Sequence, residues 1–168
     1  MLFRSGTSTH FAAEQFNLAA GIKVVHIPYK GVPEVLLDTM TGRIQYAFSP
    51  LAPAMPLVRD GRLLVLGVTT ARRSVALPDT PTLAEAGLPD YEYQDWWGMF
   101  APAKTPQSVI DKIGKEVARI VNLPDVKNQM LTQGEEATSS TPDEFTKFVH
   151  AKIDSARKVV SLAGIRPE

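Results

Sequence analysis

The sequence predicts an α/β fold, with β-α units in its first half and only helices in its second. Residues 5–70 alternate β-branched or apolar runs with helix-like segments, and glycine or proline marks the junctions. Beyond about residue 103, apolar residues recur at helical spacing and no strand-like run follows. A chain of 168 residues suffices for one domain or two small lobes with a real core.

The first helix is expected at residues 10–20, directly after a turn rich in glycine and hydroxyl residues. Apolar or small residues fall at positions i, i+4, i+7 and i+8 of this segment, on one helical face: Ala12, Phe16, Ala19 and Ala20. Gly21 stands at the usual C-cap position, so the helix is expected to end there.

Three strands are expected in the first half, at residues 22–27, 44–48 and 63–69. Their β-branched and apolar composition favours extended backbone. The last run is almost continuously apolar, which is typical of a strand buried on both faces of a parallel sheet. Short helices are expected between the strands, at residues 33–40 and 51–59.

The second half begins after an irregular connector. Residues 77–81 are rich in turn formers, residues 82–86 predict one short helical turn, and residues 96–102 predict a strand or an extended crossing segment. Three helices with broad apolar faces are then expected to begin at Pro106, Pro124 and Pro142, the last opened by a capping box of Thr141 and Glu144. These faces need a sheet or a partner to cover them.

Composition and charge exclude several classes of protein. Eighteen basic and eighteen acidic residues leave no formal net charge, so a nucleic-acid partner is not expected. No apolar run approaches the roughly 18 residues that span a bilayer. The absence of cysteine excludes disulfides and thiolate sites. The first residues lack the apolar core of a signal peptide, which at face value indicates the cytoplasm.

Catalytic and cofactor patterns are weak. His26 and His150 have neither the spacing nor the carboxylate neighbours of a zinc site, so no metal is expected. Ser8 beside His10 could act as nucleophile and base, although no G-x-S-x-G elbow is present. No nucleotide-binding glycine motif occurs, and no cofactor is predicted. A small α/β hydrolase therefore remains a third alternative.

The turn before the first helix combines features that suit an anion. Backbone N–H groups, the hydroxyls of Thr7, Ser8 and Thr9, and the positive end of the helix dipole all meet there. The competing interpretation is ordinary N-capping, for which serine and threonine are preferred whatever the function.

Five runs of the sequence resemble, in the same order, motifs of one family of binding proteins. They are residues 6–10 (GTSTH), 25–31 (VHIPYKG), 42–48 (GRIQYAF), 61–74 (GRLLVLGVTTARRS) and 77–89 (LPDTPTLAEAGLP), followed by Trp97-Gly98. Together they make the chain similar to the C-terminal part of a Bug-type solute-binding protein, the periplasmic receptor of tripartite tricarboxylate transporters.

The resemblance implies a type II periplasmic-binding-protein-like lobe in a clamshell that closes on a small carboxylate without chemistry. Residues 1–95 would form the second, ligand-binding lobe, residues 96–102 a crossing segment, and residues 103–168 helices that pack on a first lobe absent from this sequence. The implied partners are a carboxylate ligand and the membrane components of the transporter, and the implied location is the periplasm.

The resemblance also implies where the ligand binds. The residues expected to hold a ligand carboxylate at the helix start are Gly6, Thr7, Ser8, Thr9 and His10. A second choice is the loops after the expected strands, where ligands of parallel sheets bind: Tyr29, Lys30, Gly31 and Ser49. Ser49 stands where relatives often carry aspartate.

Uncovered helix faces suggest another class of function. A chain that lacks its first lobe could cover these faces by domain swapping with a second copy. The alternative prediction is therefore a self-associating interaction or structural module that binds no ligand.

Overall fold

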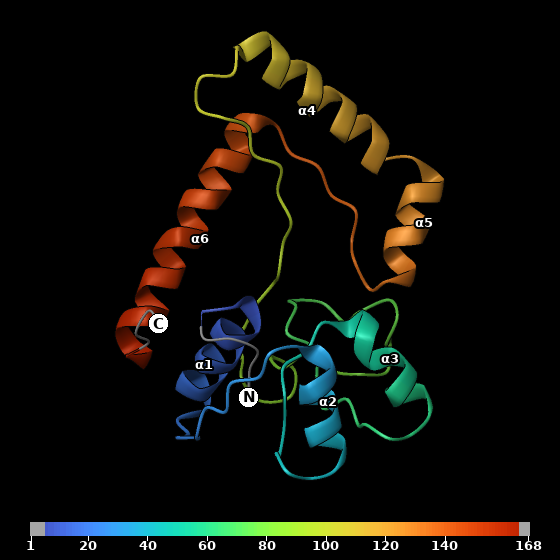
Figure 1. The fold of residues 1–168 in the computed structure, drawn as a ribbon, viewed down its shortest axis with the longest axis vertical. Coiled ribbons are helices and arrows are strands. Elements are labelled where there is room, and N and C mark those ends of the chain that lie inside the picture. Colours follow the sequence, from blue (N-terminus) through green and yellow to red (C-terminus); the bar gives the residue numbers. More distant parts are fainter. Residues whose placement is uncertain (1–5, 165–168) are drawn as a thin grey trace. The chain divides into compact units, whose positions relative to one another are not determined.

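The computed structural model describes residues 6–164 of the chain (Figure 1). Its internal contacts divide the chain into two compact units, Met1–Asp95 with Ala156–Glu168, and Trp96–Ser155. The assignment of residues 1–95, 96–102 and 103–168 to a ligand-binding lobe, a crossing segment and packing helices stays a prediction.

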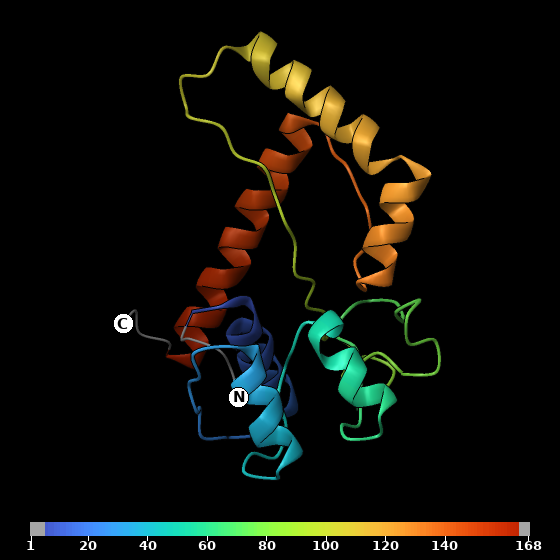
Figure 2. The ribbon, with the colours of Figure 1, turned by 45° about the vertical axis from the view of Figure 1, so that its right-hand side comes forward.

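The first unit contains the three helices that lead the chain (Figures 1 and 2). They are α1 (Ser8–Ala20), α2 (Val32–Met40), and α3 (Leu51–Arg59), which contacts α2. All three were expected, and α1 begins two residues earlier than the pattern indicated. Gly21 ends α1 with a φ of 64°, and the N–H groups of Gly21 and Ile22 donate to the last turn of the helix.

The buried face of α1 differs in part from the expected one. Ala12 and Ala13 are buried, but Ala19 is exposed and Asn17 is buried in its place. Tyr46 donates its hydroxyl hydrogen to Asn17 Oδ1 at 3.0 Å, so the polar side chain keeps a partner. Apolar periodicity could not identify a buried polar position of this kind.

The three expected strands do not form β-ladders within residues 6–164, so this prediction was wrong as to pairing. An isolated parallel bridge joins Val68 and Thr82, with Leu83 N donating to Val68 O at 2.9 Å. Residues 96–102 likewise form no ladder. Strand propensity is a local property, whereas a ladder requires a neighbouring strand. Side chains in these segments accordingly stay exposed, Val25 at 84% and Leu64 at 83%.

The aliphatic core of the first unit lies between α2 and the segment that follows it. Val35 is completely buried and Ile44 is 3% exposed, and the half-buried Tyr29 and Ala47 pack against them. Because Tyr29 packs against this cluster, the core contacts the loop that precedes α2.

A second cluster is aromatic and joins α1 to distant parts of the unit. Phe16 lies within 6.2 Å, between ring centroids, of Tyr46, Phe48 and Tyr91. Tyr91 is 2% exposed and donates its hydroxyl hydrogen to Ala12 O at 2.8 Å. Burial raises the pKa of Tyr91, so its hydroxyl remains a donor at neutral pH.

The connector before the second unit carries an ion pair and a capping box, here called the clamp, that were not predicted from the sequence. Thr82 and Glu85 exchange hydrogen bonds of 3.0 Å as a capping box, and Ala86 N donates to Thr82 O as the expected helical turn. Arg73 Nε lies 2.8 Å from Glu85 Oε2 and Arg73 Nη1 donates to Pro78 O. The signal, Thr-x-x-Glu, was present in the sequence.

The second unit contains α4 (Gln107–Val121), α5 (Pro124–Thr132), which contacts α4, and the start of α6 (Pro142–Ala163). Pro106 is the N-cap of α4 and not its first helical residue, a shift of one position. The capping box before α6 is confirmed, since Thr141 N donates to Glu144 Oε2 at 2.8 Å and Glu144 N to Thr141 Oγ1. Within residues 6–164, no helix has the length and apolar character needed to cross a membrane.

Aromatic packing holds residues 96–100 against α6 inside the second unit. The Trp96 ring lies edge-on to Phe145 and Phe148, with centroids 5.7 and 5.3 Å away, and Phe100 packs on Phe145 at 5.4 Å. Gly98 lies directly against the Phe145 ring, so close that a side-chain carbon at this position would overlap the ring.

We predict that Ile44→Ala lowers the free energy of unfolding by about 2–5 kcal/mol, because it leaves a cavity beside Val35. The matched control is Leu37→Ala on α2, whose side chain is 53% exposed and whose loss should cost less than about 0.5 kcal/mol. Urea denaturation measures both. Equal effects of the two substitutions would contradict the assignment of the core.

Gly98→Ala is predicted to destabilise the second unit by about 1–3 kcal/mol, because the added methyl group overlaps Phe145. Gly114→Ala in α4 should instead stabilise by about 0.5–1 kcal/mol, since its methyl group meets only Pro142 at an ordinary distance of 3.7 Å. Thermal melting followed by circular dichroism compares the two. The packing is refuted if Gly98→Ala melts no lower than the wild type.

The clamp at Glu85 predicts a pH-dependent loss of stability. The Thr82 N–H first, and Arg73 second, lower the pKa of Glu85 from its ordinary value of 4.5. A lowered folded-state pKa stabilises the fold above 4.5 and ceases to do so as the pH falls through the lowered value. Glu85→Gln should therefore lower the melting temperature at pH 7 and lose this effect in acid, unlike the exposed control Asp90→Asn. A difference that persists unchanged at low pH would argue against the clamp.

Candidate functional site

The N-cap residue of α1 does not use its side-chain hydroxyl to cap the helix. Thr7 is the N-cap residue, and its carbonyl accepts the first helical hydrogen bond from Phe11 N at 3.0 Å. Within the described residues the Thr7 side chain makes no capping hydrogen bond; its hydroxyl lies 3.2 Å from that of Thr9. Thr7 and Ser8 are half-buried, whereas Thr9 is buried. Of these three residues, Thr7 and Ser8 are thus the ones that retain exposed surface.

His10 stabilises the turn before α1 through its side chain. Its Nδ1 accepts a hydrogen bond from Gly6 N at 2.9 Å, so a neutral ring carries its proton on Nε2, which lies 3.7 Å from Glu14 Oε1. The ring is 5% exposed and stacks on His26 with centroids 4.4 Å apart and planes within 4°. His10 therefore shapes the helix start, and its Nδ1 is not a donor in this arrangement.

Ser8 donates its hydroxyl hydrogen to a carboxylate of this chain. Ser8 Oγ lies 3.0 Å from Asp95 Oδ2, across 87 positions of sequence. Asp95 was not among the residues expected at the site, because no local pattern links it to the helix start. The predicted pairing of Ser8 with His10 as nucleophile and base is therefore not formed, since Ser8 donates to Asp95 and His10 Nδ1 accepts from Gly6 N.

The segment that carries Asp95 lies along α1. Besides the contact of Tyr91, Gln15 Nε2 donates to Glu92 O at 3.1 Å, and Tyr93 N donates to Thr69 O at 2.8 Å. Burial first, and the negative charge of Asp95 second, raise the pKa of Tyr93 to about 12, so Tyr93 is neutral in the physiological range.

The second-choice residues lie at the starts of α2 and α3, in hydrogen bonds with near neighbours. Tyr29 donates its hydroxyl hydrogen to Asp38 Oδ2 at 2.7 Å, which raises the pKa of Tyr29. Lys30 N donates to Glu34 Oε2 at 3.1 Å. Ser49 Oγ donates to the carbonyl of the next residue at 3.0 Å. Gly31 is the N-cap of α2.

One contact links the two sets of candidates. His26, which stacks on His10, stands three residues before Tyr29 in the sequence.

A hollow of about 370 Å³ is lined by Pro28, Tyr29, Lys30 and Glu34. The positive charge of Lys30 there is accompanied by the Glu34 carboxylate, so the hollow is not a purely cationic one.

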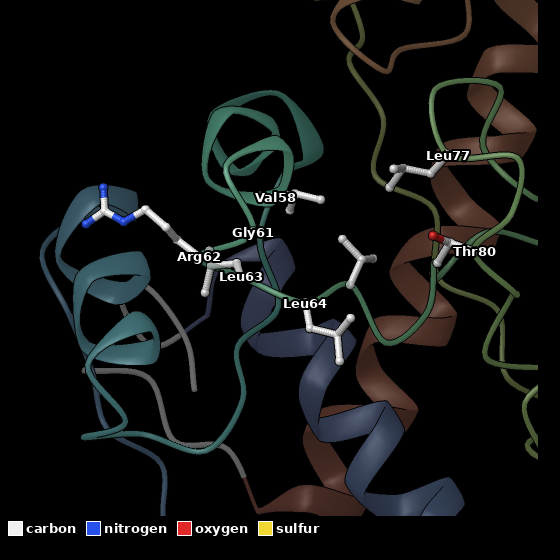
Figure 3. A pocket seen from close by; sticks show the side chains of 8 residues that line it. Val58, Gly61, Arg62, Leu63, Leu64, Leu77 and Thr80 are labelled. Atoms are coloured by element: carbon white, nitrogen blue, oxygen red, sulfur yellow. The ribbon is translucent and has the colours of Figure 1, made fainter.

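A larger open hollow, of about 510 Å³, lies elsewhere in the first unit (Figure 3). It is lined by Val58, Gly61, Arg62, Leu63, Leu64, Val65, Leu77 and Thr80. Its lining is largely hydrocarbon, and the Arg62 side chain extends away from it (Figure 3). None of the expected site residues borders it. Among residues 6–164, no group of histidine and acidic side chains could hold a metal ion.

A comparison with protein families matches nearly the whole sequence. The model of the tripartite tricarboxylate transporter family receptor matches residues 2–165. The chain belongs to this family. The predicted resemblance to Bug-type receptors is thereby confirmed, and the family is one of receptors and not of enzymes.

Individual proteins are also similar to the chain in sequence. A protein of Pseudomonas sp. (strain P51), from the tcbD-tcbE intergenic region, is 30% identical over 156 residues, which are 92% of this chain and 46% of that one. A protein of Pseudomonas knackmussii, from the clcB-clcD intergenic region, is 29% identical over 150 residues, or 89% of each chain.

A solved structure confirms the expected fold class. The structure of R. palustris Rpa4515 with adipate superposes with a TM-score of 0.86 at 32% identity, over 99% of this chain and 56% of that one. The chain thus has the fold of part of such a receptor. It spans about half the length of the strain P51 relative and of the R. palustris protein.

Proposed function

We propose that this chain binds a small carboxylate for a tripartite transporter in the periplasm, and that the start of α1 holds one carboxylate group of the ligand. One observation carries the proposal: at this helix start a serine hydroxyl already donates to a carboxylate, with Ser8 Oγ 3.0 Å from Asp95 Oδ2. Family membership and the likeness to a structure with adipate support it.

The chemistry required is capture without reaction. The N-terminus of the 13-residue helix α1 favours negative charge, and short hydroxyls supply directed donors. Thr7 and Ser8 are the half-buried donors that a ligand would meet, while Gly6, Thr9 and His10 hold the turn in shape. Charge-assisted hydrogen bonds of this type are stronger than neutral ones.

The second-choice loops would contact the remainder of the ligand. Lys30 and Tyr29 line a common hollow, and Gly31 places a helix start beside it. Ser49 stands before α3, where its neutral hydroxyl brings no charge that would repel an anion. The membrane components of the transporter are the proposed protein partners.

Exposed apolar side chains favour self-association as a second candidate. Val25 and Leu64 in one unit, and Trp97 and Phe100 in the other, are 67–85% exposed. Covering such side chains drives association. A domain-swapped homo-oligomer, with or without ligand, would cover them, and the native mass of the purified chain tests this directly.

The central test is the double variant Thr7→Ala/Ser8→Ala. Loss of two charge-assisted hydrogen bonds, at about 1.5–3 kcal/mol each, should weaken binding of adipate by roughly a hundredfold or more. Isothermal titration of the whole chain measures the Kd, after a thermal-shift panel of mono-, di- and tricarboxylates. Ligand at a hundred times its Kd should stabilise the fold by about 2.7 kcal/mol.

The matched control is Thr41→Ala/Thr132→Ala, which removes two exposed hydroxyls that donate to carbonyls of their own helices. It should leave the Kd unchanged. Equal affinities of the site variant and the wild type would place the carboxylate elsewhere. A wild type that responds to no carboxylate, in a defined oligomer, would favour the self-associating module.

A further inference from the structure

We propose that Asp95 is an internal competitor of the ligand: its carboxylate occupies the Ser8 hydroxyl until the carboxylate of a ligand displaces it. The inference rests on the proposed function, because it assumes that the start of α1 is the binding site. It adds a residue that sets affinity at this site and that no sequence pattern identified.

The contact has the geometry that competition requires. Ser8 Oγ donates to Asp95 Oδ2 at 3.0 Å, Ser8 is half-buried and Asp95 is exposed. A hydroxyl carries a single hydrogen and makes one strong donor bond at a time. A ligand carboxylate that takes this hydrogen therefore displaces Asp95, and the two negative charges would repel each other if both remained at the helix start.

The placement of Asp95 follows from contacts along the preceding residues. Tyr91 is tied to Ala12 O by a buried hydrogen bond of 2.8 Å, and the backbone of Glu92 is tied to Gln15 one helical turn further along. Tyr93 N is held by Thr69 O at 2.8 Å. Beyond these contacts, Asp95 reaches Ser8 at the N-terminus of α1. Release of the Asp95 carboxylate from Ser8 breaks none of the hydrogen bonds of residues 91–93, because none of them uses the Asp95 side chain.

Release of Asp95 exchanges one anion for another at a positively polarised helix end. The same partial charge that favours a ligand carboxylate favours the Asp95 carboxylate, so a carboxylate supplied by the chain lowers the apparent affinity for an external one. A neutral asparagine at position 95 weakens this competition and leaves the Ser8 hydroxyl in place, because an uncharged amide oxygen is a weaker acceptor than a carboxylate.

The test is Asp95→Asn, titrated with adipate as the whole chain and compared with Glu92→Gln. The control removes the same charge from the same segment, but the contact of Glu92 with Gln15 uses its backbone carbonyl and not its side chain. We expect Asp95→Asn to bind adipate about tenfold more tightly than the wild type, and Glu92→Gln to differ by less than about twofold.

Two further measurements separate competition from a general charge effect. Raising the salt from 0.05 to about 0.5 M should abolish the small effect of Glu92→Gln and preserve most of the effect of Asp95→Asn, because a direct contact is screened less than a distant charge. In a Ser8→Ala background, Asp95→Asn should lose most of its effect on affinity. The melting temperature of each unliganded variant identifies any change that acts only through stability.

The outcomes distinguish this inference from the proposed function. Tighter binding by Asp95→Asn alone, or binding by Asp95→Asn where the wild type shows none, supports it. A wild type that binds adipate while Asp95→Asn binds equally or more weakly overturns the inference and leaves the receptor function intact. Failure of the wild type and of every variant to bind any carboxylate overturns both.

Discussion

The buried hydrogen bond from Tyr91 to Ala12 is the constraint on which the helix start depends. It joins two positions 79 residues apart, and Tyr91 is 2% exposed, so water cannot replace either partner at low cost. The Phe16 ring packs edge-on to Tyr91 at 6.2 Å and fixes the same register. Because Tyr91 is held on the middle of α1, the next four residues reach its N-terminus, and Asp95 meets Ser8.

The chemistry at the start of α1 depends on which acceptors its hydrogen-bond donors contact. Gly6 N donates to His10, and Ser8 donates to Asp95. Ser8 and His10 are therefore not hydrogen-bonded to each other as nucleophile and base, and both contacts stabilise the turn. The proposed role of this turn is binding without reaction, as is typical of the receptor family to which the chain belongs.

The helices could be predicted because their determinants are local. Thr141 and Glu144 cap α6 through groups three residues apart, and Gly21 closes α1 at a φ of 64° that favours glycine. The turn that contains Thr7 was likewise identified from its composition. The strands were predicted less well, since apolar runs favour extended backbone but carry no information about which neighbour will pair with them.

The sequence by itself determined the helix positions, the hydroxyl-rich turn and the family, because each depends on residues that are close together or on motifs in a fixed order. Only the tertiary structure decided that Asn17 is buried, that the expected strands lack ladders within residues 6–164, and that Asp95 reaches Ser8. These features depend on contacts across tens of residues. Such contacts form only when the chain packs, and neither periodicity nor composition records them.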